Sequence, residues 1–489
     1  MRIAASSLVA VTEDDAPIIQ RNIIDVCVHL LNSLDYEVQR AAAAALGNLA
    51  VNQNNQVLIV DFGALVPLAA LLSSPDIEVQ VNAAGCITNL ATHDDNKDKI
   101  ANSGTLIPLT SLAQSHDIRV QRNATGALLN MTHTVNNRRQ LVSAGAIPVL
   151  VSLLNSTDYD VQYYCTTCLS NVAVDYENRR MLGEREVDLV RFLVLLMDSP
   201  ALKVQCQATL ALRNLASDDH FQLEIVGQNG LPSLRQMMQS QIPQIIQAAV
   251  ACLRNLSIHS SNETPIVESG FLPLLLDLLI LDNPEIQCHA MSTIRNLASS
   301  DENKLRIIQE GTIQRIGELL RLQEGVVFDA LKSEMTACLA VLALLEEAKP
   351  HMLRILKYLI RLTSSQDVDI MSNSAFAIGN SVVNLNEAES QAYLSHWSGF
   401  RKYVTKFISS SDPSLRHIAV WTLVQCISGN EKLRQKLSED KDLLRLIEAV
   451  SNKTIPNSRE SVSSNNCLVV ENSAEELSQT LLQELKPRE

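Results

Sequence analysis

The hydrophobic and polar positions of this chain follow the spacing of amphipathic helices over most of its length. In one such stretch, Ala208, Ala211 and Leu215 recur at intervals of three and four residues, which places small and branched side chains on one helical face. A shorter apolar stretch, 148–154, begins with a Pro that fits the first turn of a helix. The pattern predicts a chain of helices, each with an apolar side that needs a packing neighbour.

The same pattern returns at a nearly constant interval. An Asn flanked by apolar residues recurs at spacings of 41, 41, 41, 43, 41 and 41, at Asn48, Asn89, Asn130, Asn171, Asn214, Asn255 and Asn296. Before each Asn lies a Val-Gln pair or a close variant, as in Val79-Gln80. A Gly closely followed by Pro opens several units, at Gly63, Gly104, Gly145 and Gly270. The Asn, the Val-Gln pair and the opening Gly recur together at the same relative positions, which identifies an internal repeat.

Each unit is predicted to contain three helices. The Gly ends the preceding helix in a left-handed cap, and the Pro lies in the first turn of the next helix. That helix stops at a polar turn with capping residues, such as 74–76, 115–117 and 156–158. No unit can bury its apolar face alone. We therefore expect an all-α, right-handed superhelical solenoid of stacked units, whose last helices line a concave surface.

The repeat divides the chain into four parts. Residues 1–21 are an N-terminal segment that we expect to be truncated or disordered, and residues 22–450 form the solenoid of about ten units. Residues 451–473 are rich in Asn and Ser, and this composition predicts a disordered linker. Residues 474–489 contain Leu477 and Leu481 at helical spacing, which predicts a short amphipathic helix or a tail.

Composition and charge narrow the class of protein. The 489 residues include only 16 Gly and 15 Pro, which argues against a fold of many short strands and tight turns. A net charge of −14 and the lack of a long basic run argue against nucleic acid as a partner. Most of the ten cysteines lie singly in apolar helical stretches, so we expect buried thiols and a reducing compartment.

The sequence contains no motif that predicts catalysis. It has no Gly-rich phosphate loop, no His-Glu-x-x-His and no Gly-x-Ser-x-Gly. Cys165 and Cys168 have the spacing of a redox or metal motif, but they lie in the middle of a predicted helix with no second pair nearby. We therefore expect no catalytic residue, no cofactor and no metal site.

The unit length, the opening Gly, the Val-Gln pair and the Leu-x-Asn-Leu-Ala string together resemble the armadillo family. Strings such as 118–133 and 206–217 are similar to its fungal vacuolar members. This resemblance implies a myristoylated and palmitoylated scaffold on the cytosolic face of the vacuole membrane. It also implies roles in vacuole inheritance through a myosin adaptor, and in nucleus–vacuole junctions through an outer-nuclear-membrane tether. Further implied roles are vacuole fusion, and cytoplasm-to-vacuole targeting and autophagy through an autophagy-initiation subunit.

The start of the chain departs from this resemblance. Arg2 stands where myristoylation needs Gly, and the first cysteine is Cys27, inside the first predicted unit. Stable anchoring needs two lipid signals, and from its start at Met1 we expect this sequence to lack the family's lipid anchor. We expect an incomplete N-terminus rather than recruitment without lipid. From the sequence as given, we expect a soluble cytosolic chain.

The repeated asparagines are the first candidates for partner binding. An Asn side chain offers a carbonyl acceptor and an amide donor, so it can pair with the backbone of an extended partner segment. We assign this role to Asn130, Asn171, Asn214, Asn255 and Asn296. The alternative is that these side chains bond to their own helices or to the neighbouring unit.

Three arginines are the second candidates. Arg213, Arg254 and Arg295 each precede a repeated Asn and are 41 residues apart, whereas the corresponding upstream residues are uncharged. A guanidinium carries five donors, so a row of them can hold carbonyls and carboxylates of an extended segment. The resemblance implies that this row holds the nuclear tether and the autophagy subunit. The alternative is that the arginines are solvated or internally paired.

A nuclear-import receptor of armadillo type is the alternative function. Such receptors also read extended peptides through asparagines, but the resemblance to them would require tryptophans before the groove asparagines and acidic pockets for lysines. This chain has only Trp397 and Trp421, both late in the sequence, and it places Arg where acidic residues would be needed. We therefore expect a non-enzymatic membrane adaptor.

Overall fold

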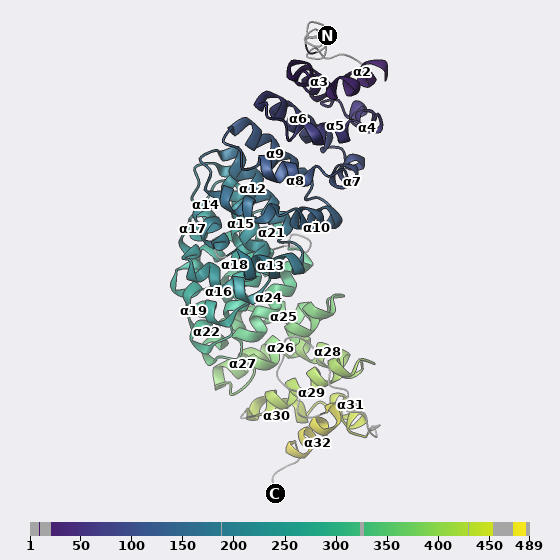
Figure 1. Ribbon diagram of the computed structural model, residues 1–489. Coiled ribbons are helices and arrows are strands. Elements are labelled where there is room, and N and C mark those ends of the chain that lie inside the picture. The colour runs from purple at the N-terminus through teal and green to yellow at the C-terminus, as the bar shows by residue number, and fades with distance from the viewer. Residues whose placement is uncertain are drawn as a thin grey trace. The chain divides into compact units, whose positions relative to one another are not determined.

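The computed structural model describes Val9 and residues 21–186, 188–322, 327–428, 430–452 and 473–485. Within these residues all regular structure is helical, with 31 α-helices, two short 3-10 helices and no strand (Figure 1). The chain divides into two compact units, Met1–Leu256 (unit 1) and Ser257–Glu489 (unit 2). The sequence repeat did not predict this division. The predicted disorder of residues 1–20 and 453–472 lies outside the described residues, apart from Val9.

Unit 1 is a series of three-helix repeats. The first helices of the repeats are α4 (Gln53–Asp61), α7 (Asp94–Asn102), α10 (Val135–Ser143), α13 (Tyr176–Arg185) and α16 (Asp219–Gly227). The second helices are α2 (Arg21–Leu31), α5 (Leu65–Leu71), α8 (Leu106–Leu112), α11 (Ala146–Ser152, followed by the 3-10 turn η1, Leu153–Asn155), α14 (Leu189–Leu196) and α17 (Gly230–Met238). The third helices are α3 (Tyr36–Leu49), α6 (Ile77–Leu90), α9 (Ile118–Asn130), α12 (Tyr159–Val172), α15 (Leu202–Leu215) and α18 (Pro243–Leu256).

Unit 2 continues the same order of helices. Its first helices are α19 (Ser260–Glu268), α22 (Asp301–Gln309), α27 (Glu387–Ser395) and α30 (Glu431–Ser438), and the 3-10 turn η2 (Glu346–Ala348) stands in for one more. Its second helices are α20 (Phe271–Leu278), α23 (Thr312–Arg321), α25 (Lys349–Leu362), α28 (Trp397–Ile408) and α31 (Lys441–Ser451). Its third helices are α21 (Pro284–Leu297), α24 (Asp329–Leu342), α26 (Val368–Ser381) and α29 (Pro413–Ile427).

The repeat boundaries are set by local backbone chemistry. Gly63 and Gly145 adopt φ values of 83° and 74°, in the left-handed region that the opening glycines were predicted to occupy. Asn229 takes the same conformation, with φ 63°, where the repeat has no Gly. The predicted caps are also confirmed, since Asp76 accepts from the backbone N–H of Val79 at 2.9 Å.

The Val-Gln pair joins the third helix to the rest of its repeat. Val79 is fully buried, and Nε2 of Gln80 donates to the backbone carbonyl of Ser74 at 2.7 Å, in the turn after the second helix. Gln162 does the same with Ser156 in the repeat of α12, also at 2.7 Å. In these two repeats, the pair thus places its Val in the core and its Gln side chain against a helix end with open backbone carbonyls.

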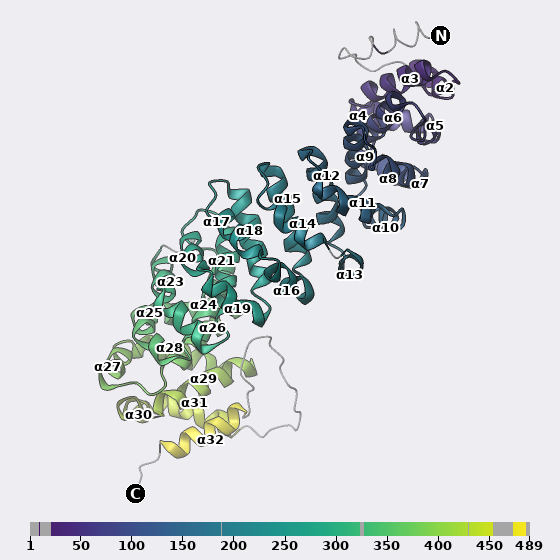
Figure 2. The ribbon, with the colours of Figure 1, turned by 60° about the vertical axis from the view of Figure 1, so that its left-hand side comes forward.

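Successive third helices pack directly on one another within each unit (Figure 2). Ala208, Ala211 and Leu215 of α15 are buried, as the spacing of apolar residues predicted. Small residues allow this close stacking: a Cβ on Gly126 of α9 would lie 3.4 Å from a methyl carbon of Thr88 on α6. The core is therefore a continuous layer between neighbouring repeats.

The last described helix, α32 (Ala474–Glu484), packs against α29 and α31 of unit 2. Ser473 and Glu476 form a reciprocal capping box at its start, and Leu481 is fully buried. Within the described residues, no single helix has both the length and the apolar composition to cross a membrane. The pair α4 and α5 meets that test together, but the two helices are bent by 89° at their junction.

Candidate functional site

The repeated asparagines lie near the ends of the third helices and are half-buried. In six of them, Nδ2 donates to a residue of the preceding repeat: Asn89 to Gly47 O (3.0 Å), Asn130 to Thr88 O (3.1 Å), Asn171 to Thr132 Oγ1 (2.7 Å), Asn214 to Ser170 O (3.0 Å), Asn255 to Arg213 O (2.9 Å) and Asn296 to Ser257 Oγ (3.1 Å). The alternative role, bonding to the neighbouring repeat, is therefore present. Each bond uses one of two amide hydrogens, so partner binding by the same side chains stays a prediction.

The predicted arginine row is distributed over both units. Arg213 is exposed on α15, and Arg254 is half-buried at the equivalent place on α18, the helix stacked on α15 in unit 1. Nη1 of Arg254 lies 3.4 Å from Oδ1 of Asn255. The structure thus brings two of the three arginines together, each beside an Asn of the repeat.

Arg295 occupies the equivalent place on α21 of unit 2. Its Nη2 lies 3.4 Å from Oδ1 of Asn296, and its Nε lies 3.3 Å from Oε2 of Glu334 on α24. The alternative that the sequence left open, internal pairing, therefore holds for this arginine. Glu334 was not among the residues that the sequence singled out, because it lies where the repeat spacing becomes irregular.

A second, buried row of asparagines was missed in the sequence. Asn96 donates from Nδ2 to the backbone carbonyls of Leu90 and Gln56, both at 3.1 Å, and thereby closes the end of α6. The members of this row, all buried, are Asn55, Asn96, Asn137, Asn178, Asn262 and Asn303. Four of the five intervals between them are 41 residues, which was a usable signal. Because these side chains are buried, a partner protein cannot reach them, and we assign them to the packing of neighbouring repeats.

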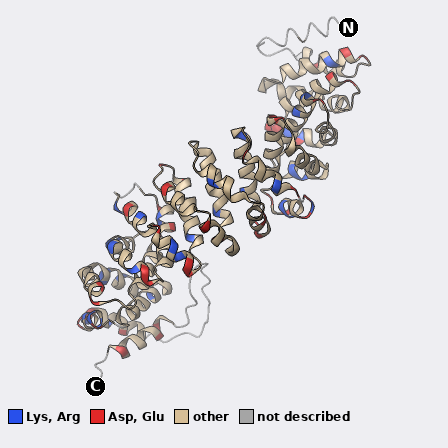
Figure 3. Ribbon diagram, turned by 90° about the vertical axis from the view of Figure 1, so that its left-hand side faces the viewer, with Lys and Arg blue, Asp and Glu red and all other residues tan. Residues whose placement is uncertain are grey.

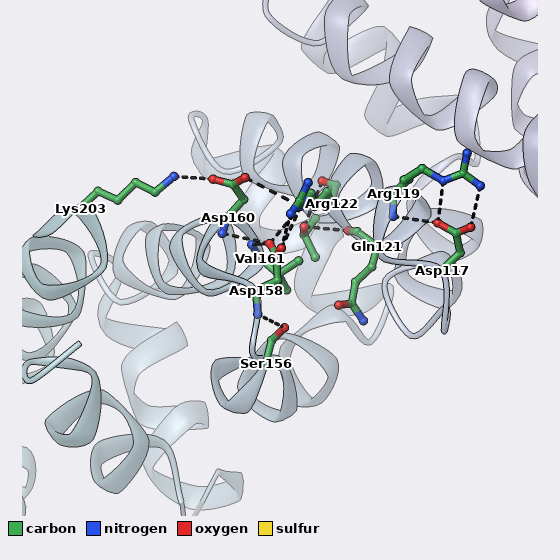
Figure 4. Close-up of polar contacts among 10 residues, drawn as sticks. Asp117, Arg119, Gln121, Arg122, Ser156, Asp158, Asp160, Val161 and Lys203 are labelled. Carbon is green, nitrogen blue, oxygen red and sulfur yellow. Dashed lines mark hydrogen bonds and ion pairs between the residues drawn. The ribbon is translucent and has the colours of Figure 1, made fainter. Parts of the chain in front are cut away.

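Charged residues connect the starts of the third helices of unit 1 (Figure 4). Nη2 of Arg119 pairs with Asp117 at 2.8 Å and with Glu78 of the preceding repeat at 2.9 Å. Arg122 pairs with Asp158 of the following repeat, and Lys203 pairs with Asp160. Hydrogen bonds from Arg119 lower the pKa of Asp117 to about 2, and the hydrogen bond from Arg122 lowers the pKa of Asp158.

Acidic and basic residues are interspersed along the helices of each unit (Figure 3). An exposed arginine beside a half-buried Asn, as at Arg213, can donate to a carbonyl or a carboxylate.

Comparison with known proteins decides the family. Five segments match the Armadillo/beta-catenin-like repeat: residues 16–51, 52–92, 93–133, 134–174 and 218–258. Vacuolar protein 8 of Schizosaccharomyces pombe is 49% identical to this chain over 458 residues, covering 91% of this chain and 82% of that protein. Vacuolar protein 8 of Candida albicans is 50% identical, covering 92% of this chain and 78% of that protein. This chain belongs to the vacuolar protein 8 family of armadillo-repeat proteins.

The family assignment agrees with solved structures. A crystal structure of an engineered protein from the Northeast Structural Genomics Consortium superposes with a TM-score of 0.75 at 28% identity, covering 83% of this chain and 99% of that protein. The predicted all-helical armadillo solenoid is thereby confirmed for this member of the vacuolar protein 8 family.

The vacuolar protein 8 family consists of non-enzymatic armadillo scaffolds, which confirms the prediction that this chain is not an enzyme. Cys165 and Cys168 are fully buried on α12, and burial raises the pKa of both thiols well above the ordinary value. Buried thiols of this kind are inert packing residues. Within the described residues, no three His, Cys, Asp or Glu side chains gather as metal ligands.

Proposed function

We propose that this chain is an adaptor that binds extended protein segments along the third helices of its repeats. The observation that carries the proposal is the equivalent placement of Arg213 and Arg254 on two stacked helices of unit 1, each followed by an Asn. A partner segment in extended conformation presents carbonyls and side chains at regular intervals, and guanidinium and amide groups at a regular interval can bind them.

The vacuolar protein 8 relatives supply the cellular setting of this proposal. We place the chain at the cytosolic face of the vacuole membrane, as a peripheral scaffold. Its partners are protein segments of an outer-nuclear-membrane tether, an autophagy-initiation subunit and a myosin adaptor. The corresponding roles are vacuole inheritance, nucleus–vacuole junctions, vacuole fusion, cytoplasm-to-vacuole targeting and autophagy.

Partner capture with an arginine-free variant tests the proposal. Replacing Arg213, Arg254 and Arg295 together by Ala should abolish capture of the tether and the autophagy subunit, while helix content stays unchanged. A matched control replaces three exposed arginines outside the third helices, Arg139, Arg180 and Arg191, by Ala. Retained capture by the first variant, or equal loss in the control, would contradict the proposal.

The nuclear-import alternative is supported by the asparagine row alone. Both tryptophans lie in unit 2, and the ring of Trp421 packs 6.0 Å from that of Phe376, centre to centre. A fluorescence titration with a basic localisation peptide and with an acidic peptide separates the two functions. Tight binding of the basic peptide would reverse the order of the two proposals.

A further inference from the structure

Arg295 differs from Arg213 in the residue that faces it from the next third helix. Within unit 2, Glu334 of α24 lies 3.3 Å from Arg295, measured from Oε2 to Nε, and the two side chains are 24% and 26% exposed. Glu334 is the eighth residue before the Leu342 that ends α24. In unit 1, the residue at that place on α18, eight before Leu256, is Ala248. Arg213 therefore has an alanine where Arg295 has a carboxylate.

The contact between Arg295 and Glu334 is poorly aligned. Oε2 of Glu334 is buried and accepts no hydrogen bond within the described residues, even though Nε of Arg295 is close. A buried carboxylate oxygen without a hydrogen bond is costly, so the nearby guanidinium charge is the main compensation for Glu334. The same guanidinium would lose part of its attraction for a second carboxylate, because its charge is already balanced.

The surroundings of Arg295 and Glu334 are poorly solvated. This strengthens the competition between Glu334 and a partner's carboxylate for the guanidinium of Arg295. Burial raises the pKa of Cys288 to about 11, and the negative charge of Glu334 adds to the effect. Burial likewise raises the pKa of Cys338 to about 12, while Arg295 acts in the opposite direction. In such surroundings, charges interact more strongly than on an open surface.

We propose that Glu334 is a specificity-determining residue that occupies Arg295 and thereby lowers the affinity of this position for acidic partner segments. The inference rests on the proposed function, since it assumes that the arginines hold carboxylates of an extended segment. It makes Arg213, which has Ala248 at the equivalent place, available to any acidic segment, and Arg295 available only to a segment that displaces Glu334.

The test uses the full chain and two labelled synthetic peptides, one of alternating Glu and Ser and one of alternating Gln and Ser. Binding is measured by fluorescence anisotropy at about 0.15 M ionic strength, because this salt concentration screens long-range attraction between the peptide and distant charges of the chain. Glu334→Gln should tighten binding of the Glu peptide by roughly five- to tenfold, because a freed guanidinium forms charge-assisted hydrogen bonds. It should leave binding of the Gln peptide unchanged.

A double-mutant cycle assigns the gain to Arg295. Arg295→Ala alone should change the affinity for the Glu peptide by less than about twofold, whereas Arg295→Ala in the Glu334→Gln background should remove the whole gain. Glu318→Gln, an exposed carboxylate that pairs with Arg315 on α23, is the matched control and should have no effect. Circular dichroism checks that each variant keeps its helix content.

The outcomes separate this inference from the proposed function. If Glu334→Gln weakens binding or leaves it unchanged while Arg213→Ala weakens it, Glu334 only stabilises the fold and this inference is wrong. If no variant changes binding of the Glu peptide, or if the wild type does not bind it, the proposed function and this inference both fail.

Discussion

The guanidinium of Arg138 and the carboxylate of Asp175 form a two-point ion pair between successive repeats of unit 1. Nε lies 2.6 Å from Oδ2 and Nη2 lies 3.1 Å from Oδ1. The side chain of Arg138 is only 10% exposed, and its Nη1 also donates to the backbone carbonyl of Thr132 at 3.0 Å. One side chain on α10 thus binds the region after α9 and the residue before α13.

Removing this arginine should weaken the stack of unit 1. Arg138→Ala removes the guanidinium from a partly buried carboxylate, which keeps only its weaker bond from Asn178, and from a helix-end carbonyl. We expect a loss of about 2–3 kcal/mol in the free energy of unfolding. Urea unfolding followed by circular dichroism measures it. Arg139→Ala, at the exposed neighbouring position of α10, should shift stability by less than about 0.5 kcal/mol. Equal effects of the two variants would contradict the prediction.

Substitution of Asn130 can distinguish a role in packing between repeats from a role in binding a partner. Its Nδ2 donates to the backbone carbonyl of Thr88 at 3.1 Å, so Asn130→Ala should lower the free energy of unfolding by about 1 kcal/mol. Asn136→Ala, at an exposed position of α10, is the control and should be close to neutral. If Asn130→Ala loses partner capture without losing stability, the side chain serves recognition rather than stacking.

Acid should destabilise the charged edge of unit 1. The pKa of Asp117 is about 2, below the ordinary 3.8, mainly because the side chain of Arg119 donates to it. A carboxylate with a lowered folded pKa stabilises the fold above its unfolded pKa, and this contribution is lost as pH falls through the folded value. The urea midpoint should therefore fall between about pH 4 and pH 2.

Two variants identify the part of this acid dependence that comes from Asp117. Asp117→Asn keeps an oxygen acceptor at the start of α9 but cannot titrate, so the midpoint should depend less on pH. Arg119→Ala removes the main donor and should raise the pKa of Asp117. An acid dependence that is identical in the wild type and Asp117→Asn would show that this carboxyl does not contribute.

Gly379 of α26 is required by close packing in unit 2. A Cβ at this position would overlap Cζ3 of Trp421 and lie 2.9 Å from its Cη2. Gly379→Ala should therefore destabilise unit 2 by about 1–3 kcal/mol, measured by thermal or urea unfolding. Gly227→Ala is the matched control, because a Cβ on this helical Gly meets no heavy atom of the described chain within 4 Å. It should be neutral or stabilising by about 0.5 kcal/mol.

The sequence by itself determined the repeat, the helices and their boundaries. Gly145 in a left-handed cap, Asp76 at a helix start and Gln80 on the preceding turn all act within one repeat, so their roles follow from local spacing. The apolar face of α15 follows from helical periodicity in the same way.

Only the tertiary structure decided which polar side chains meet between repeats. Asn130 and Thr88 are neighbours because successive third helices stack, and Glu334 reaches Arg295 because α24 packs on α21. The repeat period indicated that residues one unit apart lie on neighbouring helices, but not which atoms would come within bonding distance. Side-chain pairing depends on helix stacking and burial, and therefore the sequence predicted the arginine row but not the carboxylate that binds one of its members.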